Sequence, residues 1–211
     1  MDILHETNHL KLCGTLADKP VFSHLGRGEE FYGFPLEVSR LSGAVDRVNI
    51  IARKSLLDST ELDNSDRLLI SGQLRSYNNR SPEGARLVIT VLAESIGFCS
   101  GEDENSVFLT GTLCKPPKLR STPMGRDICD LMLAVNRRYG RSDYLPCICW
   151  GRKALEVSSW DVGTRLSLEG RLQSRKYIKI TPSGAEERTA FEVSVSQALP
   201  AAKEYPFCCE V

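Results

Sequence analysis

The chain has 211 residues, which is enough for one or two compact domains. Its composition, 41% hydrophobic and 26% charged, is that of a globular protein and excludes disordered and fibrous classes. The apolar runs are far shorter than the about 20 residues that a membrane helix needs. The first residues also lack the basic and apolar regions of a signal peptide. We therefore expect a cytoplasmic protein with no membrane partner.

The chain contains an internal repeat. Residues 10–16 read LKLCGTL and residues 107–113 read VFLTGTL, so that Gly14 and Gly111 are 97 positions apart. Further matches follow in the same order with small shifts: residues 36–40 with 133–137, residues 68–74 with 166–172, and residues 89–91 with 191–193. Two copies in the same order indicate two domains of one fold.

Each copy is predicted to consist of strands, because apolar and polar residues alternate over four to eight positions between turn-forming segments. One segment per copy favours a helix, Lys54–Asp63 in the first and Lys153–Trp160 in the second. This is the plan of an OB barrel. We therefore expect an all-β fold of two tandem, five-stranded Greek-key OB barrels, each with a short helix between strands 3 and 4. The strand glycines, at 14, 72, 111 and 170, are expected at bends.

The domain boundaries are expected at composition changes. Residues 1–96 form a first, diverged OB-fold domain, residues 97–104 a short acidic linker, residues 105–199 a second OB-fold domain and residues 200–211 a short C-terminal tail. Residues 1–96 carry 11 basic and 13 acidic side chains, whereas residues 105–199 carry 15 and 9. The net charge of zero therefore hides a positive second domain, as a nucleic-acid-binding domain requires.

The eight cysteines do not have the paired spacing of a zinc site. Cys147 and Cys149 alternate along a predicted strand, so both should face the same side, and Cys208 is adjacent to Cys209. Since no export signal is present, we expect reduced thiols rather than disulfides. We expect no metal ion and no cofactor.

The second copy resembles the bacterial single-stranded-DNA-binding (SSB) proteins in four segments. These are Leu133-Ala134-Val135-Asn136-Arg137-Arg138-Tyr139, the strand from Tyr144 to Trp150-Gly151, Glu169-Gly170-Arg171-Leu172-Gln173-Ser174-Arg175-Lys176-Tyr177, and residues 188–193. Together they cover most of the second copy in order. A proline at position 146 departs from the pattern and implies a strand edge or a bulge.

The resemblance implies a surface on which aromatic side chains stack bases and basic side chains contact phosphates. The stacking residues would be Tyr139, Tyr144, Trp150 and Tyr177, and the basic residues would be Arg137, Arg138, Arg171, Arg175 and Lys176. Arg126, Arg152 and Lys179 are weaker candidates. Every base has a flat π-face, so stacking does not read sequence. It also leaves DNA and RNA undistinguished.

The first copy lacks the stacking set. Ser42, Arg47, Arg53 and Asn79 stand at the equivalent positions, so this barrel is expected to serve assembly more than binding, although its arginines could contact phosphates. By the resemblance, two barrels per chain imply a homodimer with four OB folds. Tyr205-Pro206-Phe207 is similar to the family's terminal motif for docking replication proteins, but four residues follow it.

Catalytic signatures are missing from the sequence, so the protein is not expected to be an enzyme. The histidines lie near the N-terminus, and no phosphate-binding loop, zinc-protease or serine-hydrolase motif occurs. The sequence predicts sequence-independent binding of single-stranded DNA in replication, recombination or repair. The alternative is a primosome-type or mobile-element OB-fold module that acts mainly through protein contacts.

Overall fold

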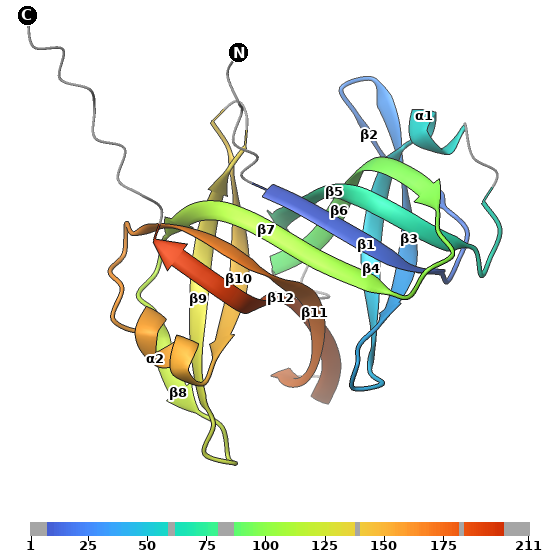
Figure 1. Cartoon of the computed structure of the whole chain (residues 1–211). Helices are drawn as coiled ribbons and strands as arrows, with labels where there is room; N and C mark the ends of the chain where they lie inside the picture. Colours follow the sequence, from blue (N-terminus) through green and yellow to red (C-terminus); the bar gives the residue numbers. More distant parts are fainter. Residues whose placement is uncertain (1–7, 59–61, 80–86, 138–139, 182–183, 201–211) are drawn as a thin grey trace, which may run out of the picture.

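The computed structural model describes residues 8–58, 62–79, 87–137, 140–181 and 184–200. These residues form two β-barrels that lie side by side (Figure 1). In this part of the chain, no helix has the length and apolar character needed to cross a membrane.

The first barrel is a closed ring of five strands. In spatial order they are β1 (Asn8–Leu16), β3 (Glu29–Ser39), β4 (Val45–Arg53), β6 (Leu87–Phe98) and β5 (Arg67–Asn78). The ring closes because β1 pairs with both β3 and β5. A sixth strand, β2 (Val21–Gly26), pairs with β3 outside the ring, and the helix α1 (Lys54–Leu57) follows β4.

The second barrel repeats this ring. Its strands are β7 (Glu104–Leu113), β9 (Asp127–Asn136), β10 (Ser142–Trp150), β12 (Gly184–Pro200) and β11 (Arg165–Thr181). β7 closes the ring by pairing with β9 and β11. The short strand β8 (Lys118–Ser121) pairs with β9, and the helix α2 (Arg152–Val157) follows β10.

Both rings are OB folds, as the sequence predicted, with the helix between the third and fourth ring strands. Alternate residues of each strand fill the cores, for example Leu10 and Leu12 of β1. Both helices are shorter than predicted. The hydroxyls of Ser158 and Ser159 donate to the carbonyls of Leu155 and Glu156, and such local bonds compete with helix continuation.

The strand glycines lie where two backbones approach closely. A Cβ built on Gly72 would lie 2.2 Å from the carbonyl oxygen of Leu92, and one on Gly170 would lie 2.3 Å from that of Ser194. Each glycine lies at a register shift, where the partner strand carries the extra residue of a β-bulge, Glu94 in β6 and Ser196 in β12. Gly72 and Gly170 are also the last residues of their strands to pair with β1 and β7. The bend expected from the sequence is confirmed at both positions.

The two barrels are joined by antiparallel pairing of β1 with β7, which extends from Asn8 opposite Leu109 to Cys13 opposite Glu104. Adding the repeat offset of 97 to Asn8 gives Asn105, and subtracting it from Leu109 gives Leu12. Asn105 and Leu12 are themselves paired in the same ladder. The barrels are therefore related by a pseudo-two-fold axis. The resulting sheet runs without interruption through the twelve strands that the described residues form.

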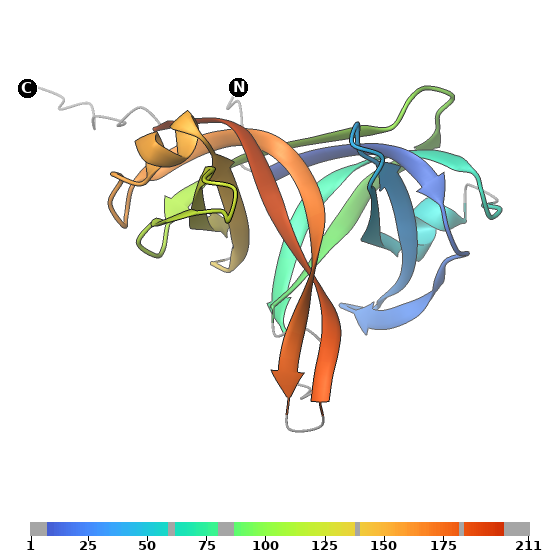
Figure 2. The ribbon, with the colours of Figure 1, turned by 90° about the horizontal axis from the view of Figure 1, so that it is seen from below.

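Each barrel also carries a hairpin arm that contacts the other barrel. We call residues 74–78 with 87–91 the first arm, and residues 172–181 with 184–193 the second arm, whose outer part projects beyond both barrels (Figure 2). The first arm contacts β10 and the second contacts β4.

A buried aspartate fixes each arm to the opposite barrel. Asp46 of β4 accepts hydrogen bonds from the backbone N–H of Ser174 (2.6 Å) and from its hydroxyl (2.7 Å), while Arg40 pairs with the same carboxylate. In the second joint Asp143 of β10 accepts from the backbone N–H of Ser76 at 2.5 Å. The two carboxylates are only 1% and 0% exposed. Leaving the partners of such a buried carboxylate unsatisfied costs about 1–3 kcal/mol, so the joints hold the barrels in one arrangement.

The linker is anchored as well. The Asp103 carboxylate pairs with Arg67 and accepts from the backbone N–H of Ser39 at 2.6 Å. Cys13 and Cys99 form a disulfide, which corrects the expectation of reduced thiols at these positions. The two cysteines are 86 residues apart in sequence, and only the pairing of β5 with both β1 and β6 brings them together.

Replacing Gly72 with alanine is expected to destabilise the protein by about 3 kcal/mol, because the new Cβ would overlap the Leu92 carbonyl and force the strands apart. Gly97→Ala is the matched control, since a Cβ at Gly97 would meet no atom within 4 Å. Urea unfolding of both variants measures the difference. Equal midpoints would show that the close approach at Gly72 is not required.

The Asp46 joint predicts a pH effect. Burial acts to raise the pKa of Asp46, but the hydrogen bond from Arg40 and those from Ser174 outweigh it and hold this pKa below its ordinary value. The carboxylate therefore stabilises the fold at neutral pH, and this contribution is lost as pH falls below about 4. We expect Asp46→Asn to cost about 2 kcal/mol at pH 7 and to lose less further stability between pH 7 and pH 3 than the wild type.

The control for Asp46→Asn is Asp18→Asn, which alters an exposed ion pair with Arg47 and is expected to cost less than about 1 kcal/mol. Urea unfolding midpoints at the two pH values provide the measurement. A pH dependence in Asp46→Asn as steep as that of the wild type would contradict the prediction.

Candidate nucleic-acid interface

The outer face of the second barrel is set by the alternation of β10. Leu145, Cys147 and Cys149 point into the core, as the sequence predicted for the two cysteines. The alternate positions, Tyr144, Pro146, Ile148 and Trp150, therefore face outward. Pro146 pairs with β9 on one side, while on the other side the pairing with β12 involves only Cys147 and Ile148. The proline thus lies at an open stretch of strand, as expected.

Trp150 lies at one end of this face and is half-buried. Its cross-strand neighbour is Ile128 of β9, which is buried outside the main core cluster, as is Ile148. These two isoleucines give the outer face an apolar floor. The guanidinium carbon of Arg126, on the turn between β8 and β9, lies 5.6 Å from the centre of the Trp150 ring. This cation–π contact orients the indole and places a positive charge beside it.

The second arm contributes the other end of the face. Arg171, Arg175 and Tyr177 alternate with inward positions of β11, so they share one side of the strand. The Arg175 guanidinium lies 5.8 Å from the Tyr177 ring centre and 3.8 Å from a carboxylate oxygen of Glu192. Lys176 alternates to the other side of the arm, where its ammonium is 3.0 Å from Glu187. The structure thus separates Lys176 from the other basic residues of the predicted set.

The predicted residues around the connection between β9 and β10 have different outcomes. Tyr144 is 49% exposed and lies on the outer face. Arg137, by contrast, belongs to the inter-barrel joint: its Nε donates to Asp143 at 2.7 Å and its Nη2 donates to the carbonyl of Ser76 at 2.9 Å. Arg138 and Tyr139 lie outside the described residues. The geometry therefore gives Arg137 a structural role that the sequence did not indicate.

The equivalent face of the first barrel is electrostatically neutralised. Arg47, at the position of Tyr144, pairs with Asp18 and lies 3.5 Å from Glu37. Arg53, at the position of Trp150, is 3.0 Å from Glu29. These arginines are engaged with carboxylates of their own barrel, which explains how one fold can present two different surfaces.

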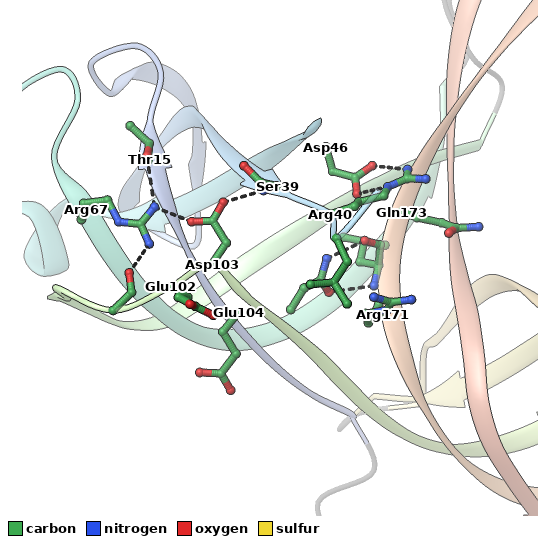
Figure 3. A pocket seen from close by; sticks show the side chains of 14 residues that line it. Thr15, Ser39, Arg40, Asp46, Arg67, Glu102, Asp103, Glu104, Arg171 and Gln173 are labelled. Carbon is green, nitrogen blue, oxygen red and sulfur yellow. Dashed lines mark hydrogen bonds and ion pairs between the residues drawn. The ribbon is translucent and has the colours of Figure 1, made fainter. Parts of the chain in front are cut away.

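A groove of about 660 Å³ lies between the barrels (Figure 3). Arg171 and Gln173 line one side, and Arg67 with Asp103 lies on the other. Two of its three arginines, Arg40 and Arg67, are paired with Asp46 and Asp103. The acidic linker therefore limits the positive field on this side of Arg171.

The core thiols are unsuited to chemistry. Burial raises the pKa of Cys149 to about 12, with a further contribution from Cys129, and burial also raises the pKa of Cys147. These side chains stay protonated and unreactive at neutral pH. In the described ranges no three His, Cys, Asp or Glu side chains are grouped to hold a metal ion. That the protein needs neither metal nor cofactor stays a prediction.

Arg126, only a weaker candidate by sequence, contacts the Trp150 ring, and Ile128 was not among the candidates. Arg126 contacts Trp150 across the β8–β9 turn, and this turn was not predicted as part of the face. Alternation along β9 could have indicated that Ile128 faces the same side as Trp150, because Ile128 stands on the side opposite to core residues such as Cys129.

This fold places the chain in the class of proteins that carry two OB barrels in one chain. The wild-type single-stranded DNA binding protein from Thermus aquaticus has the same fold: its crystal structure superimposes with a TM-score of 0.77 at 22% identity, over 94% of each chain.

Residues 104–199 match the model of the single-strand binding protein family. Single-stranded DNA-binding protein A from Bacillus subtilis (strain 168) is 38% identical over 80 residues, which cover 35% of this chain and 46% of that protein. Single-stranded DNA-binding protein 1 from Staphylococcus aureus (strain COL) is 36% identical over 80 residues, or 35% of this chain and 48% of that protein. This chain thus spans about half the length of the curated relatives it matches. Its second barrel belongs to the single-strand binding protein family.

Proposed function

We propose that this protein binds single-stranded DNA without regard to base sequence and performs no chemistry on it. Bases would stack on Tyr144, Trp150 and Tyr177, and phosphates would contact Arg126, Arg171 and Arg175. The observation that carries the proposal is that one outer face holds both sets of side chains, while the equivalent face of the first barrel has its arginines paired with acids. Base–aromatic stacking contributes about 1–3 kcal/mol per base, so three rings would support stable binding.

Arg138 and Tyr139 complete the proposed set, since the family resemblance assigns them to it. Lys176 is kept as a phosphate contact from the opposite side of the arm. Arg137 is left out, because its guanidinium is held by Asp143 and Ser76. The relatives are named as single-stranded DNA-binding proteins, and we extend that activity to this chain, in the cytoplasm and in replication, recombination or repair.

Two chains are proposed to associate, giving four OB folds, of which two bind DNA. This rests on the family resemblance. The strands β2 and β8 end the twelve-stranded order, and their residues are exposed, so they provide edges for pairing. Such a unit would have a shorter DNA footprint than one with four binding barrels. Replication proteins are further proposed partners.

The alternative function is a protein-interaction module. The hairpin of β2 and β3 favours it, because the apolar side chains of Val21, Phe22 and Leu25 are exposed there on the first barrel. The two functions differ in their response to DNA: the module would show neither fluorescence quenching by poly-dT nor salt-dependent binding.

Tryptophan fluorescence tests the stacking residue. Poly-dT is expected to quench the emission of the wild type, and Trp150→Phe should remove most of this response because the ring on the outer face is lost. Trp160→Phe is the control, since Trp160 packs against the core and should not contact bases. If quenching survives in Trp150→Phe and disappears in Trp160→Phe, the outer face is not the binding surface.

Salt dependence tests the phosphate contacts. Each phosphate contact with single-stranded DNA contributes about 0.7 to the slope of log affinity against log salt concentration. Arg171→Gln should therefore reduce the slope by about that amount. Arg53→Gln changes the paired arginine of the first barrel and should leave the slope unchanged. Equal slopes in wild type and Arg171→Gln would remove Arg171 from the interface.

A further inference from the structure

The joint between the first arm and β10 lies directly beside the proposed stacking surface. The backbone N–H of Tyr144 donates to the hydroxyl of Ser76 at 2.7 Å, and the backbone N–H of Ser76 donates to Asp143 at 2.5 Å. A residue of the first barrel is thus bonded to the backbone of a proposed base-stacking residue of the second.

Tyr77 follows Ser76 directly and is 55% exposed. Ser76 faces β10 and is buried, so Tyr77 points to the other side of β5, where its ring meets solvent. Tyr144 is half-exposed too, and its backbone N–H is hydrogen-bonded to Ser76, the residue before Tyr77. Two accessible aromatic residues from different barrels are thus linked through a single residue, Ser76.

The charge at this joint differs from that at its pseudo-symmetric equivalent. Arg75 and Arg137 both contact the single carboxylate of Asp143, at 3.1 Å for Arg75. At the other joint, Asp46 pairs with Arg40, and Gln173 stands at the position equivalent to Arg75. Two cations and one anion leave a net positive charge beside Tyr144, whereas the other joint is balanced. The side chains of Arg75 and Arg137 are 23% and 27% exposed.

We propose that the first barrel takes part in DNA binding at this one place, where Tyr77 and Arg75 of its arm continue the path of single-stranded DNA beyond Tyr144. This inference rests on the proposed function. Tyr77 would stack a further base, and Arg75 would add a positive charge for a neighbouring phosphate. Asp143 is then a positioning residue, because it holds the arm of one barrel against the binding strand of the other.

Equilibrium binding to a dT oligonucleotide of about 20 residues, longer than the site of one OB fold, tests the proposal. Tyr77→Ala is expected to lower the affinity about tenfold, and Tyr77→Phe, which keeps an aromatic face, should restore it. Phe22→Ala is the matched control: Phe22 is also 55% exposed on the first barrel, but it lies on β2 at the far end of the strand order and should not affect binding.

A second measurement needs no variant. A bromodeoxyuridine-substituted oligonucleotide crosslinked to the wild type by ultraviolet light should label a peptide that contains Tyr77. If the wild type binds but Tyr77→Ala matches Phe22→Ala and all crosslinks fall in the second barrel, this inference is overturned while the proposed function stands. If the wild type itself neither binds nor crosslinks, the proposed function fails.

Discussion

The antiparallel pairing of β1 with β7 makes a single sheet out of two barrels, and most other features of the molecule depend on it. Because the pairing is symmetric under the repeat offset, each barrel meets the other with the same elements. The arms are thereby placed against β4 and β10, where the buried carboxylates of Asp46 and Asp143 hold them. A change in this register by one residue would turn every side chain of the strand to the opposite face and separate the joints.

On this symmetric frame the two barrels present unlike surfaces. Where the second barrel has Tyr144 and Trp150, the first has Arg47 and Arg53, and acids of the same barrel neutralise both arginines. Duplication preserves the backbone because the core and the close-packed glycines constrain it. The outer positions have no such constraint, since they contact solvent or ligand, and they have diverged. The first barrel has Arg75 where the second has Gln173, and this difference changes the charge of a joint without changing its architecture.

The site could be predicted in part. The outward direction of Tyr144 and Trp150 follows from alternation along one strand, and the approximate position of Tyr177 and Arg175 follows from the family resemblance. The family resemblance predicts that Arg137 contacts phosphate. In the structure its guanidinium donates to Asp143 and to the carbonyl of Ser76, which belongs to the other barrel and is 61 positions away. Sequence likewise gave no indication that Cys13 and Cys99 meet, since two strand pairings are needed to bring them together.

The sequence by itself determined that there are two OB barrels, that glycine stands where strands bend, and that the positive charge and the aromatic set belong to the second copy. These are local properties: alternation, turn chemistry and charge can be counted residue by residue. Only the tertiary structure decided which strands join the barrels, that Asp46 and Asp143 are buried beneath the opposite arms, and that Ser76, the neighbour of Tyr77, is bonded to Tyr144. Each of these is a contact between residues distant in the chain, and such contacts arise from the packing of complete barrels, which a local pattern does not encode.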